Sequence, residues 1–226
     1  MVYQPVIPIT GYGGWKFLES TFDKQFEGFT DSASVRNDRE YFQEKMSSPV
    51  AIEDFLSDRR LLRISLTSFD LGGEEWKVGF LRHMMEEQAD PDSSFLKRLN
   101  SPAYTAFATT FTVTDGKISL SQDTIASLAD DFERAAFRSA VGNVDNNMKL
   151  SLNYEAKVGD LVREGSSDEA NLYRLLGDVP TRTVLETALN LPTSWQQLDV
   201  DQQADILKER VLSVFSISQI SALANE

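Results

Sequence analysis

Apolar residues recur at helical spacing along most of the chain, most clearly in the segment 15–29. Its apolar positions follow one another at intervals of three or four residues, and charged residues stand between them. Such a stripe is typical of a helix that buries one face. The stripe consists of Trp15, Leu18, Phe22, Phe26 and Phe29. Residues 1–14, which are rich in proline and glycine, are predicted to form an extended lead-in and a turn.

Further helices are predicted wherever this spacing returns between turn or capping residues. The stretch 148–158 also alternates as a strand would, but its charged residues and its continuation to Val162 favour a helix. Trp76 is expected on the buried face of its helix, and Asp92 is expected to cap the short helix that follows it. The predicted helices cover residues 35–46, 52–71, 74–88, 95–99, 102–111, 122–141, 148–162, 168–176, 180–189, 201–215 and 218–224.

The predicted fold class is therefore all-α, a multi-helix body of two weakly repeated helical lobes. β-Branched residues and the turn signal Asp115-Gly116 allow at most one small hairpin near 111–120. We expect this turn to join an N-terminal lobe, 1–114, to a C-terminal lobe, 115–226. The same pattern is also compatible with one continuous domain.

The evidence for a repeat is a pair of similar segments. Phe55-Leu56-Ser57-Asp58 precedes Phe69-Asp70-Leu71, and Leu175-Leu176-Gly177-Asp178 precedes Leu189-Asn190-Leu191 at the same spacing. Two imperfect copies do not make a solenoid, which needs at least three. They suit a body with two related halves.

Charge narrows the classes of partner. The chain carries 35 acidic and 22 basic side chains, a formal charge of −13 that is spread along its length. A field of this sign repels nucleic acid and anionic membranes, so neither is an expected partner. It leaves room for a protein partner.

The absence of cysteine and the hydropathy of the chain bear on the cellular compartment of the protein. The chain has no cysteine, which fits a reducing compartment and equally permits export in an unfolded form. Its N-terminus lacks the basic and uninterrupted apolar regions of a secretory signal, and no apolar run reaches the roughly 20 residues that span a bilayer. We expect a soluble, cytoplasmic protein that does not insert into membranes.

No catalytic, cofactor-binding or metal site is predicted. His83 is the single histidine, which argues against di-iron bundles, His-rich zinc sites and a Ser-His-acid triad. Neighbouring acid pairs such as Asp130-Asp131 diverge by about 100° on a helix, so a solvated face explains them better than general acid–base work.

Two groups of residues remain as candidates for contact with a partner. The first is the densest basic cluster, which could receive an acidic protein, although pairing with Glu53, Asp54 or a neighbouring helix is the commoner role of such arginines. The second is the glycine-rich turn before the first helix, which lacks the features of a phosphate-binding loop. The candidate residues are Arg59, Arg60, Arg63, Gly13 and Trp15.

Several segments together resemble one bacterial family. They are Gly-Tyr-Gly-Gly-Trp-Lys-Phe-Leu at 11–18, Asp-Arg-Arg-Leu-Leu-Arg at 58–63, Leu-Asn-Leu-Pro at 189–192 and Leu-Asp-Val-Asp-Gln-Gln at 198–203. The family is a domain of unknown function in proteins associated with flagellar gene clusters in alphaproteobacteria. The likeness covers nearly the whole chain, except that Ser216 follows Phe215 where relatives often have glycine.

This resemblance implies an all-helical fold and a link to flagellar assembly or function, and it brings no catalytic residues. We therefore expect a non-enzymatic accessory or interaction factor with a protein partner, which the resemblance places in the flagellum. One alternative is a structural component exported through the flagellar apparatus. Another is a carboxylate-based enzyme unrelated to motility.

Overall fold

The chain folds into two compact units, Met1–Ala140 and Val141–Glu226. The computed structural model describes residues 3–88, 95–99 and 101–225, so the predicted cap Asp92 lies outside the described residues. Nearly all of the regular structure is helical, which confirms the all-α prediction. The turn at Asp115-Gly116, where the sequence analysis placed the junction, lies inside the first unit.

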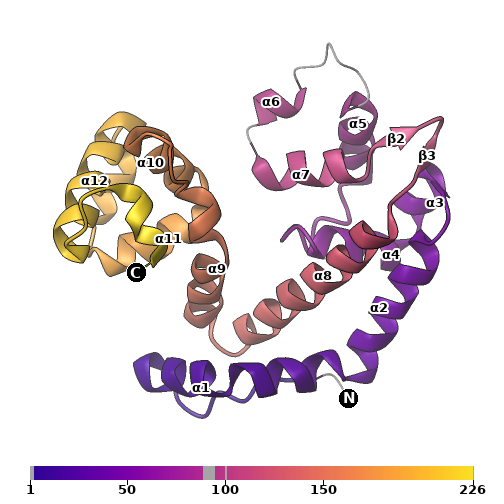
Figure 1. The fold of residues 1–226 in the computed structure, drawn as a ribbon, viewed down its shortest axis with the longest axis horizontal. Helices are drawn as coiled ribbons and strands as arrows, with labels where there is room; N and C mark the ends of the chain where they lie inside the picture. The colour runs from indigo at the N-terminus through magenta and orange to yellow at the C-terminus, as the bar shows by residue number, and fades with distance from the viewer. Residues whose placement is uncertain (1–2, 89–94, 100, 226) are drawn as a thin grey trace. The chain divides into compact units, whose positions relative to one another are not determined.

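The first unit contains most of the helices and three very short strands (Figure 1). Its elements are α1 (Gly11–Thr30), α2 (Ala33–Met46), β1 (Val50–Ala51), α3 (Ile52–Ser57), α4 (Arg59–Thr67), α5 (Val78–Gln88), α6 (Phe95–Leu99), α7 (Pro102–Thr110), β2 (Val113–Thr114), β3 (Lys117–Ile118) and α8 (Gln122–Gly142).

Phe137 joins α8 to α1. Its ring is buried and lies edge-on to three phenylalanines of the α1 stripe, at centroid distances of 5.3 Å to Phe22, 5.5 Å to Phe26 and 5.4 Å to Phe29. Edge-to-face pairs of this kind add to the energy of apolar burial. The stripe predicted from sequence thus finds its partner in a helix more than one hundred residues away in the chain.

A second aromatic cluster fills the space around α3 and α7. Phe107 and Phe111, both fully buried, contact each other and Phe55 of α3, and Phe69 closes the group with edge-on contacts. Phe107 belongs to α7 and Phe111 follows its last residue, within the predicted helix 102–111. These rings bring the segment after α4 and the end of α7 onto one core.

The predicted hairpin is confirmed as β2 and β3. Asp115 and Gly116 both have positive φ, 51° and 74°, which a tight two-residue hairpin turn requires. β3 also pairs antiparallel with β1, with Val50 opposite Ile118, and the Ile52 amide donates to the Gly116 carbonyl at 3.1 Å. This third strand was not predicted, and it ties the hairpin into the first unit.

The predicted helix 52–71 is wrong in one respect, because the structure divides it at Asp58. The backbone of Asp58 leaves the helical region at φ −78° and ψ 93°, and its carboxylate accepts hydrogen bonds from the amides of Arg60 and Leu61. Asp58 therefore ends α3 and caps α4. An aspartate favours this cap over a helix interior, because its side chain competes for backbone amides.

Two helix starts also differ from the prediction. The predicted helix 74–88 begins at Val78, and Trp76 lies in the preceding turn with 74% of its surface exposed instead of buried. Glycine at 72 and 73 and the Glu74–Lys77 ion pair shape this turn. Conversely, α1 begins at Gly11, so Gly11 to Trp15 form its first turn and not a flexible lead-in.

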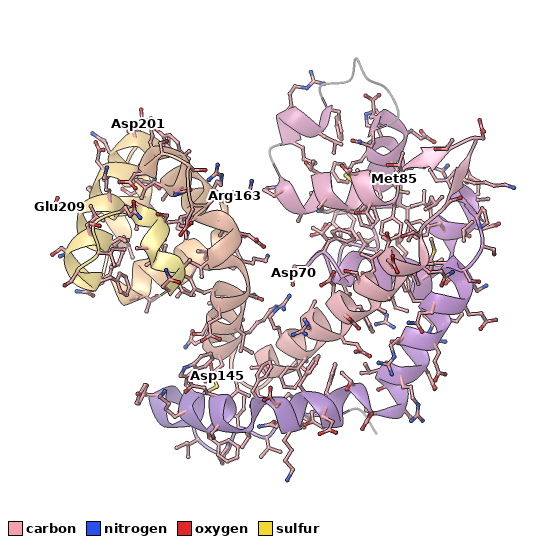
Figure 2. All side chains as sticks on the ribbon, in the orientation of Figure 1. Asp70, Met85, Asp145, Arg163, Asp201 and Glu209 are labelled. Atoms are coloured by element: carbon pink, nitrogen blue, oxygen red, sulfur yellow. The ribbon has the colours of Figure 1, made fainter. Side chains whose placement is uncertain are left out.

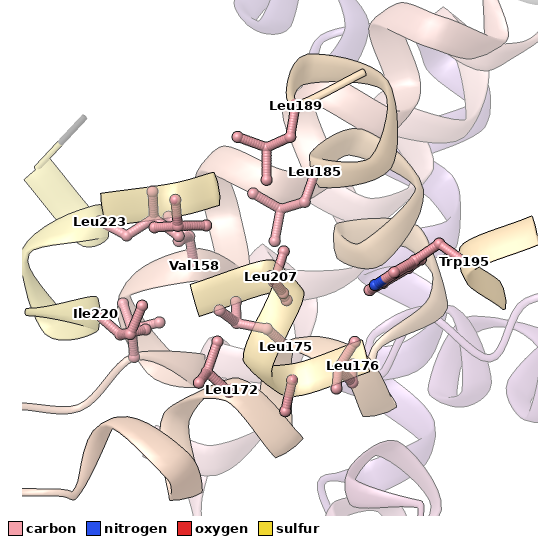
Figure 3. Packing of buried hydrophobic residues seen from close by; sticks show 13 residues of the cluster. Val158, Leu172, Leu175, Leu176, Leu185, Leu189, Trp195, Leu207, Ile220 and Leu223 are labelled. Carbon is pink, nitrogen blue, oxygen red and sulfur yellow. The ribbon is translucent and has the colours of Figure 1, made fainter. Parts of the chain in front are cut away.

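The second unit packs a single apolar cluster between short helices (Figure 3). The segment 148–162, ambiguous from sequence, is helical, and Leu207 projects into the cluster beside Leu175 and Trp195. The predicted last helix is a 3-10 helix whose Ile220 and Leu223 are buried. The elements are α9 (Asn146–Leu161), α10 (Asp168–Gly177), α11 (Val179–Ala188), the 3-10 helix η1 (Thr193–Gln197), α12 (Val200–Phe215) and η2 (Ile220–Asn225).

Polar side chains define the helix ends of this unit. Asp145, Ser167, Asp178 and Asp199 each accept backbone amide hydrogen bonds at the start of α9, α10, α11 and α12. Asp201, labelled in Figure 2, lies in the first turn of α12 and accepts a hydrogen bond from the Tyr173 hydroxyl at 2.6 Å. Asp199 therefore caps a helix, and Asp201 links α12 to α10.

The weak internal repeat is structural. Asp178 ends α10 and caps α11 with φ −90° and ψ 99°, as Asp58 does between α3 and α4. The turn after each second helix contains a residue with positive φ, Asp70 at 58° and Asn190 at 50°, and the next amide donates to the carbonyl five residues back. One copy lies in each unit, so the repeat reflects local helix-ending chemistry.

Phe137→Ala is expected to lower the unfolding free energy by about 3–5 kcal/mol, because it leaves a cavity among three rings of α1. Urea denaturation followed by far-UV circular dichroism measures this loss. The control is Phe17→Ala, which removes an exposed ring from α1, the helix that Phe137 packs against. Equal losses for the two variants would contradict the central role of Phe137.

Glu133→Gln is expected to reduce the pH dependence of stability. The Glu133 carboxylate of α8 is buried, and burial raises its pKa above the usual 4.5 although it pairs with Arg39 at 2.9 Å. A raised folded-state pKa means that stability is lost as pH rises above 4.5. Urea denaturation at about pH 5 and about pH 8 should show a larger loss for wild type than for the variant.

The matched control is Glu40→Gln, at an exposed acid of α2. It should keep the wild-type difference between the two pH values. A Glu133→Gln variant with the same difference as wild type would show that this carboxyl is charged at no cost to folding.

Candidate functional site

The sequence candidates lie on two helices of the first unit. Arg59, Arg60 and Arg63 belong to the first turns of α4, whereas Gly13 and Trp15 belong to the first turn of α1. No contact recorded for the described residues joins the two groups. They are therefore two separate surfaces.

Arg60 and Arg63 converge on one carboxylate of the neighbouring helix α2. The Arg60 Nε donates to Asp38 Oδ1 at 2.7 Å, and the Arg63 Nη2 donates to Asp38 Oδ2 at 2.5 Å. The three-residue spacing on α4 places both guanidinium groups on one face. The sequence left open whether the arginines pair with Glu53 and Asp54 or with a neighbouring helix. The structure shows that Arg60 and Arg63 pair with a neighbouring helix.

Tyr41 of α2 supports this arrangement from the side. The Arg60 guanidinium lies 4.3 Å from the centre of the Tyr41 ring, a cation–π contact, and Lys45 lies 5.5 Å from the same ring. The Tyr41 hydroxyl donates to Asp58, the residue that caps α4. Tyr41, Asp58 and the start of α4 thus hold Arg60 in place.

The hydrogen bond between Tyr41 and Asp58 affects the pKa of both groups. Acceptance by the Asp58 carboxylate raises the pKa of the Tyr41 hydroxyl. Burial acts to raise the pKa of Asp58, but hydrogen bonds from the Leu61 amide and from Tyr41 outweigh it and hold that pKa below 3.8. Asp58 is therefore ionised at neutral pH and its charge is used inside the structure.

The three arginines carry more positive charge than the single carboxylate of Asp38 neutralises. Arg59 is exposed and has no ion pair with a described residue, and Arg60 and Arg63 share one acid. Glu53 does not contribute, because its carboxylate binds Arg82 at 2.5 and 2.6 Å. We call Asp38, Tyr41, Arg59, Arg60 and Arg63 the arginine surface.

Gly13 and Trp15 have mainly structural surroundings. A Cβ atom on Gly13 would lie 2.8 Å from the Ile9 side chain, so glycine lets the N-terminal segment approach α1 closely. Trp15 is partly buried on the apolar stripe. Their neighbour Tyr12, which was not singled out from sequence, is 76% exposed.

Asp38 and Tyr41 were also missed from sequence. They fall at i and i+3 of the predicted helix 35–46, with Lys45 at i+7, so all three lie on one helical face. The pairing of that face with α4 depends on how the two helices pack, which the spacing does not contain.

The remaining titratable groups of the described residues are spread over the surface and the helix ends. The described residues hold no group of three or more His, Asp or Glu side chains placed to bind a metal ion. His83 is exposed, lies 3.9 Å from Glu87 and packs edge-on to Phe95 at 4.7 Å. Within the described part of the chain, no helix has both the length and the apolar character needed to cross a bilayer.

Residues 68–225 match the DUF1217 family, which is described as a protein of unknown function. The chain belongs to this family. The matched range includes Phe69, Phe107 and Phe111 of the second aromatic cluster, α8 and nearly all of the second unit, whereas Phe55, the arginine surface and α1 precede it. The family's description assigns this DUF1217 protein no activity.

A crystal structure of protein AGR_C_984 from Agrobacterium tumefaciens is similar to this chain. The two share 22% sequence identity with a TM-score of 0.69, over 98% of this chain and 90% of the other. At this identity the likeness concerns the fold alone. A comparison with curated proteins finds no match.

Asp58→Ala is expected to lower the unfolding free energy by about 1 kcal/mol, because α4 loses its N-cap. The variant also frees the Tyr41 hydroxyl, so Arg60 loses part of its support. Urea denaturation measures the loss, with Asp54→Ala as control at an exposed acid of α3. Equal stability of the two variants would show that the cap contributes nothing.

Proposed function

We propose that this DUF1217 protein is a non-enzymatic interaction factor of the bacterial flagellar system. In this proposal, the arginine surface receives an acidic segment of a flagellar protein. The proposal has two parts, the flagellar context and the binding role, which rest on different support.

The flagellar context rests on sequence resemblance. The motifs at 11–18, 58–63, 189–192 and 198–203 resemble those of proteins associated with flagellar gene clusters. The second of these motifs contains all three arginines of the arginine surface and the cap Asp58. The resemblance and the binding geometry therefore meet in the same residues.

The binding role rests on the surplus of guanidinium groups. Asp38 accepts from two arginines at once, so an incoming carboxylate could pair with Arg59 and share Arg60 or Arg63. Guanidinium groups bind carboxylates through two parallel hydrogen bonds, which gives strength and orientation. The protein as a whole has a charge of −13 and repels acidic partners, so an acidic partner is attracted only to this positively charged surface.

The internal repeat supports a functional reading of these arginines. In the second copy, where Asp178 takes the place of Asp58, the positions of Arg59, Arg60 and Arg63 are held by Val179, Pro180 and Thr183. The same helix–cap–helix unit therefore forms without arginine at these three positions. Since the local fold does not require them, the arginines of the first copy are available for recognition.

The placement of the acids favours a binding protein over a carboxylate-based enzyme. An enzyme that uses carboxylates needs acids that converge. Here Glu74 is occupied by Lys77 and Tyr104, and Asp130 is exposed.

Deletion of the gene is expected to impair swimming or filament assembly. Complementation with the wild-type gene should restore motility, whereas the triple variant Arg59→Glu/Arg60→Glu/Arg63→Glu should not, because an acidic partner is then repelled. Swimming radius in soft agar and filament counts by electron microscopy measure both effects. The control Lys117→Glu/Arg210→Glu changes two exposed cations elsewhere and should complement normally.

The two parts of the proposal fail in different ways. A deletion strain that swims normally and builds ordinary filaments would overturn the flagellar role. If deletion impairs motility but the folded triple variant complements fully, the arginine surface is not the contact. Circular dichroism of the purified variants establishes that they are folded.

A further inference from the structure

Residues 3–10, which we call the strap, run back along α1 from its end toward its beginning (Figure 1). The Tyr3 ring packs edge-on to Phe29 at 5.7 Å and lies 3.3 Å from where a Cβ of Gly28 would be. At the other end, the Ile9 side chain lies against Gly13. The strap is thus extended and antiparallel to the helix it precedes.

Gln25 of α1 recognises the backbone of the strap. Its side-chain oxygen accepts from the Val6 amide at 2.8 Å, and its side-chain nitrogen donates to the Val6 carbonyl at 3.1 Å. The same nitrogen donates to the Thr21 hydroxyl at 2.8 Å, which fixes the orientation of the amide. Gln25 is buried, so it forms a built peptide-binding group that reads main chain and not a particular side chain.

The strap is suited to being bound as an extended peptide. Pro5 and Pro8 lack amide hydrogens and hold φ near −65°, which favours an extended chain and lowers the entropy cost of ordering it. Pro5 is buried, whereas Val6 and Ile9 are 59% and 58% exposed. The strap therefore leaves part of its apolar surface exposed.

The face of α1 that contacts the strap at Gly13, Gln25 and Gly28, which we call the α1 channel, carries two glycines. Gly13 and Gly28 lie near its two ends, and a Cβ at either position would press on the strap, at 2.8 Å from Ile9 and 3.3 Å from Tyr3. Glycine in a helix interior costs about 1 kcal/mol relative to alanine. The close seating of the strap offsets that cost.

A single residue connects the strap to α1. Gly11 has a φ of +70°, and no atom outside its immediate neighbours lies within 4 Å of its Cβ position. The chain reverses here, and rotation at this residue would project the strap away from its own helix. Short reversals of this kind favour exchange of the segment that they connect between copies.

We propose that the α1 channel also binds the strap of a second copy of this chain, so that two copies exchange straps reciprocally. The exchanged pair keeps every contact of the strap, because the same residues fill the same channel. It gains contact at the crossing point, where Ile9 and Tyr12 are 58% and 76% exposed in one copy. A reciprocal exchange closes on itself as a two-fold dimer. This proposal is independent of the arginine surface.

Because the chain has no cysteine, a disulfide between two introduced cysteines tests the exchange directly. One chain carries Tyr3→Cys and another carries Gly28→Cys; the two are mixed, incubated and oxidised. Exchange places the two thiols together, and we expect a disulfide-linked heterodimer on non-reducing gels. The control mixture pairs Tyr3→Cys with Glu209→Cys, an exposed position of the second unit, which reports random collision (Figure 2). A chain with both Tyr3→Cys and Gly28→Cys shows that the geometry permits the bond.

Heterodimer formation well above the Glu209→Cys control supports exchange. If the double-cysteine chain closes on itself while the mixture only matches the control, the strap stays on its own helix and the proposal is overturned. If the double-cysteine chain does not close, Gly11→Pro decides. Proline is tolerated at a helix start but cannot adopt the positive φ of Gly11. The variant should shift toward dimer in sedimentation velocity, and a Gly11→Pro variant that remains monomeric would overturn the proposal.

Discussion

The packing of Phe137 among Phe22, Phe26 and Phe29 holds the first unit together. It sets α8 against α1, and α1 in turn carries the strap on one side and leads directly into α2. α8 follows the hairpin, whose strand β3 pairs with β1 ahead of α3. One aromatic contact between distant segments thus fixes the frame on which both candidate surfaces are mounted. Loss of that contact would affect the arginine surface and the channel alike.

Two aspartates of this acidic protein each bind several groups at once. Asp58 uses one carboxylate to end α3, cap α4 and bind Tyr41, while Asp38 accepts from two arginines. Concentrating the acids of this region into such roles leaves guanidinium groups with unused donors. The arginine surface is therefore a local exception to a charge of −13, produced by which acids are already occupied.

Several features could be predicted from the sequence because their causes are local. The α1 stripe, the hairpin turn at Asp115-Gly116 and the caps of the second unit depend on residues within a few positions of one another. The repeat belongs to the same group, since Asp58 and Asp178 each combine a helix end with a helix start. The prediction of one helix over 52–71 was wrong at Asp58. The apolar spacing continues through this residue, although its side chain favours a helix cap. The predicted burial of Trp76 was wrong for a related reason. The turn that contains Trp76 interrupts the helix, whereas the apolar spacing continues through it.

By itself, the sequence determined the all-α class, the main helices, the small hairpin and the set of arginines that form a candidate contact. Periodicity and capping express these features directly, because they arise between residues three or four positions apart. Only the tertiary structure decided that Phe137 meets α1, that β1 joins the hairpin, that Asp38 and Tyr41 flank the arginines, and that Gln25 holds the backbone of Val6. Each of these contacts joins residues from different elements. Such pairings follow from how apolar faces pack in three dimensions, which the spacing along one chain does not record.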